Sequence, residues 1–266
     1  MAVCAQPGIP FWKAGQIPNP SEEKNIFNVE ENNRLAAIAA DSRYARLTNG
    51  SMVEYCSKVF ARHIRRGRVL ELGPAEGVMT PHLAGLADQL TLVDGAGVFC
   101  ERLQQNYPRA EVVHSLFEEF KPKDVFDSIV LGHVLEHVDD PVAILSLVKH
   151  WLAPGGRVFA AVPNSRSLHR QAAVIMGLLP FEEALNEADL HHGHRRVFNP
   201  ETFRGAFVQS GLRIEVFGGF WLKPVSNAQV EASWTPAMLS AFMQLGERYP
   251  DIAAEIYVVA GRPATP

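Results

Sequence analysis

Short apolar segments alternate with helix-like segments between residues 68 and 162, and this alternation constrains the fold most strongly. The predicted strands are Arg68–Leu72, Leu90–Val93, Glu111–His114, Ser128–Leu131 and Arg157–Val162. The helices between them begin near Gly77, Gly97 and Pro141. Strands joined through helices run parallel and bury both of their faces. The sequence therefore predicts an α/β fold in which helices cover both sides of a parallel sheet.

The chain changes character on either side of this alternation. Several prolines and little periodicity at the N-terminus predict a flexible arm. Two apolar helical patterns, near Glu30–Ala40 and Ser51–Arg66, follow it. Beyond the core, a helix is expected from Pro200 to Ser210, with two last strands near Arg213–Leu222 and Ala253–Ala260. The predicted units are an arm (1–28), a helical extension (29–66), an α/β core (67–164), an inserted segment (165–211) and the closing strands (212–266).

One predicted helix has clear signals at both ends. Asp140 can accept hydrogen bonds from the first turn, and Pro141 suits the first helical position. Pro154, Gly155 and Gly156 predict the end of this helix, because glycine adopts the left-handed conformation readily.

Composition excludes several classes of protein. With 47% hydrophobic and 20% charged residues and a net charge of −4, the chain has no broad basic surface for nucleic acid. Cys4, Cys56 and Cys100 are too widely spaced for a zinc site and are predicted to be reduced thiols. Neither a signal peptide nor a membrane span is recognisable. We therefore expect a cytoplasmic protein.

Four ordered segments carry a resemblance to a known family. They are Val69–Thr80 (VLELGPAEGVMT), Leu90–Asp94 (LTLVD), Phe126–Val138 (FDSIVLGHVLEHV) and Ala153–Asn164 (APGGRVFAAVPN). The set resembles class I S-adenosylmethionine-dependent methyltransferases, in particular the small-molecule branch with Leu-Glu-His in the third segment. This resemblance, over about residues 50–262, implies a Rossmann-like seven-stranded sheet with a lid inserted after the fifth strand. It also implies S-adenosylmethionine as cofactor and S-adenosylhomocysteine as product.

The resemblance places the cofactor at the turn after the first strand. Gly73, Ala75 and Gly77 alternate there, and Ala75 stands where the family usually has a third glycine. Small residues let the backbone approach a ligand, and the next helix offers free N–H groups. The alternative interpretation is a tight strand-to-helix turn without a ligand.

Two carboxylates accompany this turn. Asp94, at the end of the second strand, is expected to accept hydrogen bonds from the two ribose hydroxyls, since a carboxylate suits a diol. An exposed loop aspartate is the alternative. By resemblance, Glu71 helps to anchor the amine of the methionine portion.

The resemblance also assigns the adenine and methionine ends. Ser115, Leu116 and Phe117 follow the third strand, where the family holds adenine, although the family's common aspartate is missing. Gly132 and His133 are expected beside the methionine portion.

His133 is the candidate catalytic residue. It follows the fourth strand closely and titrates near neutrality, so it can act as a base or orient the acceptor. Packing beside the cofactor without proton transfer is the alternative.

The turn His191–Arg196 and the end of the sixth strand supply candidate substrate contacts. His192, His194, Arg195 and Trp221 are the residues concerned. Salt bridges from Arg195 to acidic residues, and core packing for Trp221, are the structural alternatives. The histidine spacing fits no standard zinc site, so no metal is predicted.

The predicted function is methyl transfer from S-adenosylmethionine to an oxygen or nitrogen of a small molecule, such as a sugar or specialised metabolite, in biosynthesis. A peptide or protein methyltransferase and a catalytically silent cofactor-binding module are the alternatives. A remote one is an NAD-dependent oxidoreductase, whose G-x-G-x-x-G fingerprint is not matched. The predicted partner is the small-molecule substrate, with neither nucleic acid nor membrane, and a homodimer is left open.

Overall fold

A computed structural model of the chain describes residues 20–42, 45 and 47–263. In this part of the chain, seven strands form one sheet with the order β3-β2-β1-β4-β5-β7-β6. The strands are β1 (Gly67–Leu72), β2 (Ala87–Asp94), β3 (Glu111–His114), β4 (Phe126–Gly132), β5 (Leu152–Pro163), β6 (Arg213–Phe220) and β7 (Glu255–Gly261). The seven-stranded α/β sheet predicted from the sequence is confirmed.

The first five strands pair in parallel, and β7 lies antiparallel between β5 and β6. In the antiparallel register, Val158 of β5 faces Ala260 of β7. Because β1 has β2 on one side and β4 on the other, the chain reverses its direction across the sheet at this point. Ligands of open α/β sheets bind at such a switch point, outside the carboxyl ends of the strands.

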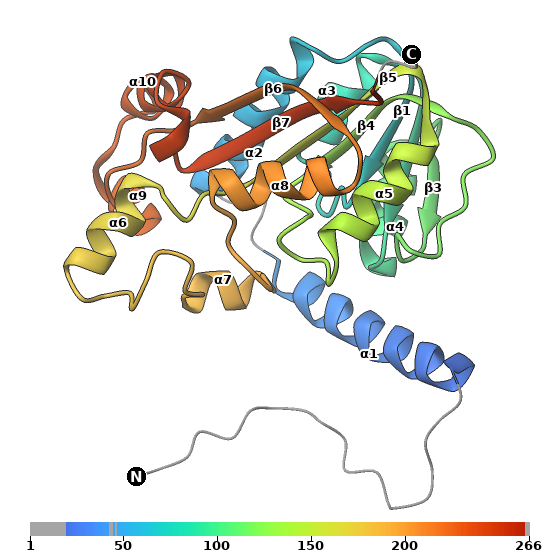
Figure 1. Cartoon of the computed structure of the whole chain (residues 1–266), viewed down its shortest axis with the longest axis horizontal. Coiled ribbons are helices and arrows are strands. Elements are labelled where there is room, and N and C mark those ends of the chain that lie inside the picture. Colours follow the sequence, from blue (N-terminus) through green and yellow to red (C-terminus); the bar gives the residue numbers. More distant parts are fainter. Residues whose placement is uncertain (1–19, 43–44, 46, 264–266) are drawn as a thin grey trace, which may run out of the picture.

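Helices cover both faces of the sheet (Figure 1). On one face, α5 and α8 bury Ile144 and Phe207 against Leu70 and Leu131. On the other face, α2 buries Phe60 against strand residues such as Phe159. The described helices are α1 (Pro20–Ala40), α2 (Leu47–Ala61), α3 (Thr80–Ala84), α4 (Gly97–Asn106), α5 (Pro141–Trp151), α6 (Leu168–Ile175), α7 (Glu187–His191), α8 (Pro200–Gln209), α9 (Asn227–Ser233) and α10 (Pro236–Gly246). A short 3₁₀ helix, Pro250–Ile252, precedes β7.

Alternation along the strands explains why both faces are apolar. Val69 and Leu70 are adjacent in β1 and fully buried, but they belong to different core clusters on opposite faces. Successive side chains of a strand point to opposite sides, so a strand between two helical layers is apolar throughout. The continuous apolar runs in the sequence are therefore a consequence of the double helical cover.

The structure corrects several element boundaries. Helix α1 begins at Pro20, inside the segment predicted as a flexible arm, and residues 1–19 lie outside the described residues. Helix α2 ends at Ala61 rather than near Arg66, and α3 begins only at Thr80. The Asp140 cap is confirmed: its carboxylate accepts the N–H groups of Val142 and Ala143, each at 2.9 Å.

The predicted end of α5 is wrong. The helix ends at Trp151 and β5 begins at Leu152, so the Pro-Gly-Gly segment belongs to the strand. Gly155 does adopt a positive φ of 72°, but it shapes the irregular start of β5, where the pairing with β4 shifts its register. The Pro-Gly-Gly segment begins three residues beyond the last residue of the helix.

None of the helices in the described part of the chain combines the length and apolar character needed to cross a membrane. Cys56 and Cys100 are free and buried, whereas Cys4 lies outside the described residues.

Candidate functional site

The turn after β1 has an unusual backbone. Gly73, Ala75 and Gly77 have φ values of 66°, 49° and 78°, so every second residue is left-handed. A Cβ on Gly73 would lie 2.8 Å from the Val134 side chain, so any other residue there would force its neighbours to shift. For an alanine such as Ala75, the left-handed conformation costs about 1 kcal/mol. A hydrogen bond from the Ala75 N–H to the Asp94 carboxylate, 3.0 Å long, holds it in place.

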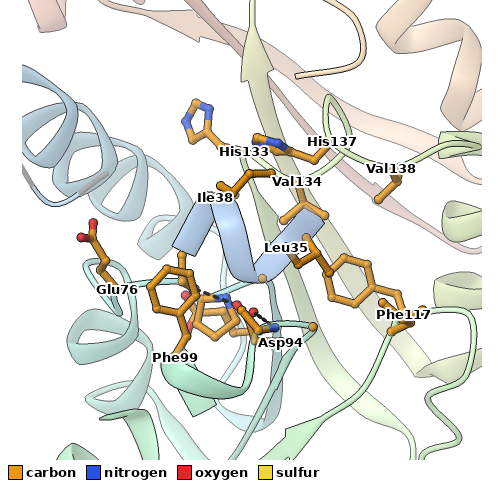
Figure 2. A pocket seen from close by; sticks show the side chains of 18 of the residues that line it. Leu35, Ile38, Glu76, Asp94, Phe99, Phe117, His133, Val134, His137 and Val138 are labelled. Carbon is orange, nitrogen blue, oxygen red and sulfur yellow. Dashed lines mark hydrogen bonds between the residues drawn. The ribbon is translucent and has the colours of Figure 1, made fainter. Parts of the chain in front are cut away.

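Asp94 connects this turn to the end of β2. Its two carboxylate oxygens accept N–H groups from Ala75 and from Ala96, the latter at 2.8 Å. The residue is only 7% exposed, and burial raises its pKa despite these two hydrogen bonds. Each oxygen keeps a further acceptor position. Figure 2 shows the carboxylate at the floor of a cavity with its hydrogen bonds dashed.

Glu71 lies beneath the same turn. It is buried, and the Thr80 hydroxyl donates a 2.8 Å hydrogen bond to it. Burial raises its pKa to about 8, with a smaller contribution from the negative charge of Asp94. A cation placed in the cavity would therefore stabilise the charged form of this carboxyl.

The cavity brings together the loops that follow β1, β2, β3 and β4. Its lining includes the predicted residues Glu71, Gly73, Ala75, Asp94, Ser115, Leu116, Phe117, Gly132 and His133. Gly77 is the exception among the predicted cofactor residues, because it shapes the turn from behind. The loops that carry the predicted cofactor residues therefore line a single cavity.

The segment after β3 is tied to Asp94. The Ser115 N–H donates to the Asp94 carbonyl at 3.0 Å, while the Ser115 hydroxyl donates to the Leu116 carbonyl at 2.9 Å. Leu116 is buried and Phe117 half-buried, and both line the cavity. This wall is apolar and suits the face of a flat ring.

Helix α1 supplies a wall that the sequence did not predict. Leu35 and Ile38 reach into the cavity between Asp94 and the histidines of the loop after β4 (Figure 2). A Cβ on Gly95 would lie only 2.5 Å from Leu35, so the helix packs closely on the loop after β2. Leu35 and Ile38 are three residues apart, and this helical spacing was the available signal.

Ion pairs join α1 to the turn His191–Arg196. Glu31 accepts hydrogen bonds from Arg34 at 2.6 Å and from Arg195 at 2.7 Å. Arg34 also donates to the Gly193 carbonyl at 3.1 Å. Two segments far apart in the sequence therefore close one side of the cavity together.

Arg195 is fully engaged with protein groups. It contacts Glu31 and Asp139, each at 2.7 Å, and donates to the His137 carbonyl at 2.8 Å. These contacts favour the structural interpretation of this arginine over a substrate contact.

His133 adopts a left-handed φ of 59° and is 8% exposed. Its Nδ1 lies 3.5 Å from Glu136 and 3.7 Å from Glu255. Burial by itself lowers the pKa of His133, but Cys56 and the two carboxylates outweigh it and raise the pKa well above the usual value. A raised pKa favours the protonated imidazole, and the protonated form cannot act as a base. The geometry favours an orienting role over that of a base.

The other predicted substrate residues lie outside the cavity. Trp221 is 1% exposed and belongs to the core under α2 and α10, with Lys223 stacked 4.6 Å from its ring centroid. The ring of His192 meets that of His191 edge to face. His194 is directed towards Glu136 and His137, and these three residues place potential metal ligands within 4.8 Å of one another.

A sheet of order 3-2-1-4-5-7-6, a carboxylate at the end of β2 and a cavity at the switch point define the fold of class I S-adenosylmethionine-dependent methyltransferases. The family model described as a methyltransferase domain matches residues 44–215. The chain belongs to this family, and its methyl donor is S-adenosylmethionine, as the sequence predicts.

Two sequence relatives are ubiquinone biosynthesis O-methyltransferases. The protein of Xylella fastidiosa (strain 9a5c) is 27% identical over 169 residues, which cover 60% of this chain and 66% of that protein. The protein of Xanthomonas euvesicatoria pv. vesicatoria (strain 85-10) is 28% identical over 225 residues, covering 79% of this chain and 91% of that protein.

A solved structure confirms the fold at lower identity. It is the Burkholderia thailandensis 1,6-didemethyltoxoflavin-N1-methyltransferase, with 1,6-didemethyltoxoflavin and S-adenosylhomocysteine bound. The TM-score is 0.59 with 15% identity, and the match covers 95% of this chain and 94% of that chain.

Proposed function

We propose that the cavity at the switch point binds S-adenosylmethionine and that the enzyme methylates an oxygen or nitrogen of a small molecule. The observation that carries the proposal is the setting of Asp94. Its carboxylate is buried at the cavity floor, fixed by two N–H groups, and still has acceptor positions for a ribose diol.

The remaining walls suit the other parts of the cofactor. The apolar surface of Leu116 and Phe117 would hold the adenine, and the turn from Gly73 to Gly77 would pass along the methionine portion. The positive methionine amine would stabilise the charged form of Glu71, which burial disfavours. Gly132 and His133 would stand near the methyl group, with His133 orienting the acceptor.

The cover over the cofactor cavity favours a small molecule as the methyl acceptor. Helix α1 covers the cavity and is joined by ion pairs to the turn His191–Arg196, within the segment 165–211 that we propose as the lid. Methyl transfer requires alignment of the acceptor with the methyl carbon and exclusion of water, and both follow from such a cover. The sequence relatives are named as O-methyltransferases and the Burkholderia structure as an N-methyltransferase. Either acceptor atom is therefore consistent with the comparisons.

The domain division 29–66, 67–164, 165–211 and 212–266, with the first of these units extended back to the start of α1 at Pro20, belongs to this proposal, as do the cytoplasmic location and the absence of a nucleic acid partner. A homodimer stays a prediction.

Turnover tests the proposal. The full chain would be incubated with S-adenosylmethionine and panels of phenols, sugars, small amines and unstructured peptides, and S-adenosylhomocysteine would be measured by mass spectrometry. Product with a small hydroxyl or amine compound, at rates well above those with peptides, is the expected result. Methylation of peptides alone would replace the proposal with a protein methyltransferase. Cofactor binding without turnover of any acceptor would favour a silent binding module.

A further inference from the structure

We propose that Glu136, His137 and His194 bind one divalent metal ion beside the cofactor cavity. Glu136 and His137 follow β4, and His194 belongs to the turn His191–Arg196. Each offers a ligand atom, and the three atoms lie within 4.8 Å of one another. A bound ion, about 2.1 Å from each atom, would draw them together by roughly an ångström.

The backbone brings these two distant segments together. The Arg195 N–H donates to the Glu136 carbonyl at 2.8 Å, and Nδ1 of His137 lies 3.3 Å from the Gly193 carbonyl. The rings of His137 and His194 meet edge to face, with centroids 4.8 Å apart. These contacts to main-chain carbonyls hold the two segments beside each other.

The Glu136 carboxylate is the observation that carries the proposal, because the two histidines beside it approach its oxygens without making a hydrogen bond. The residue is 0% exposed, and neither of its oxygens accepts a hydrogen bond of ordinary geometry from any residue that the structure describes. His133 approaches only to 3.5 Å, and Nε2 of His137 to 4.0 Å. The charge of a protonated His133 at this distance offsets part of the cost of burying the carboxylate but leaves both of its oxygens without a hydrogen bond, and a coordinated metal ion would occupy them.

Asp189 lies beside His194 as a carboxylate commonly lies beside a metal-binding histidine. Its carboxylate lies 3.3 Å from Nδ1 of His194 and is itself held by Arg170 and by the Asn186 N–H, each at 3.0 Å. A carboxylate beside a ligating histidine fixes the orientation of the ring. The Gly193 carbonyl has the equivalent place beside His137.

Two imidazoles and one carboxylate suit Zn²⁺ and neighbouring first-row divalent ions, and three protein ligands leave positions open. His137 also lines the cofactor cavity, so the ion would lie at the edge of that cavity. This part rests on the proposed function: the ion would bind an acceptor hydroxyl and lower its pKa, with its proton released to water. The oxygen then forms its bond to the methyl carbon while the carbon–sulfur bond breaks and sulfur keeps the electron pair.

Metal binding is measured on the full chain after treatment with a chelator, by competition for Zn²⁺ with a chromophoric chelator. We expect one ion per chain, and affinity weaker by at least about tenfold in Glu136→Gln and in His194→Gln. His191→Ala is the matched control, because His191 lies on the same turn and pairs instead with Asp41. Equal affinity in all four proteins, or no binding by the wild type, would overturn the proposal.

A second measurement does not depend on the variants. X-ray absorption of the Zn²⁺-loaded wild type should show scattering from two imidazole rings, and a spectrum without it would refute the site even if a variant failed to fold. S-adenosylhomocysteine binding, titrated separately, distinguishes failure of the metal site from failure of the methyltransferase assignment.

Discussion

Glu31 is predicted to hold helix α1 over the cofactor cavity, and its removal should weaken cofactor binding. Its side chain is 15% exposed and contacts Arg34 and Arg195, which are 27% and 29% exposed. Charge-assisted hydrogen bonds contribute more than exposed ion pairs, and partial exposure reduces them to about 1–2 kcal/mol together. If closure of α1 accompanies binding, Glu31→Ala should weaken S-adenosylhomocysteine binding about 5- to 30-fold.

The assay is calorimetric titration with S-adenosylhomocysteine, combined with hydrogen exchange of the α1 amides. Glu30→Ala is the control, because Glu30 is exposed on the same helix. Burial raises the pKa of Glu31, but Arg34 and Arg195 outweigh it, so the folded-state pKa is lowered. The ion pairs therefore contribute above the ordinary pKa of about 4.3 and are lost as the pH falls through the lower folded value. Unchanged affinity and unchanged exchange in Glu31→Ala would refute this role of α1.

Three further predictions concern stability and are measured by urea denaturation. Gly73→Ala should destabilise the protein by about 1–3 kcal/mol, through its left-handed φ and a steric clash, and more than Gly177→Ala, which has a similar φ but open space. Because burial raises the pKa of Glu71 to about 8, this residue should make stability fall between about pH 4.5 and pH 8, and Glu71→Gln should remove that fall; identical pH profiles would contradict the assignment. Arg170→Met should cost about 3–5 kcal/mol, because it leaves the Asp189 carboxylate buried without its guanidinium partner; a loss below 1 kcal/mol would show that water reaches the aspartate.

The sequence was sufficient for the sheet and for the position of Asp94. Continuous apolar strands separated by helices leave few alternatives to a doubly covered parallel sheet. A carboxylate at the end of such a strand must lie at the carboxyl edge of the sheet, and the family resemblance implies its place beside the turn that follows β1. Both conclusions depend on local patterns together with the ordered motifs that carry the family resemblance.

Contacts between distant segments were beyond the reach of the sequence. The approach of Glu31 to Arg195, and of Glu136 to His194, depends on how α1 and the turn His191–Arg196 pack on the core. For the same reason the sequence does not show which carboxylates surround His133, since Glu255 comes from β7, at the other end of the chain. Periodicity shows which residues face inward, but it does not identify their partners.

The central claim is that Asp94 anchors the ribose of S-adenosylmethionine in the cavity at the switch point. We would titrate the purified full chain calorimetrically with S-adenosylmethionine, S-adenosylhomocysteine and NAD, and repeat the series with Asp94→Ala. The account predicts binding of the first two ligands but not of NAD, and a loss of about 30-fold or more in the variant, since hydrogen bonds to a charged group contribute about 1.5–3 kcal/mol each. Equal affinity of the wild type and Asp94→Ala, or binding of NAD alone, would contradict it.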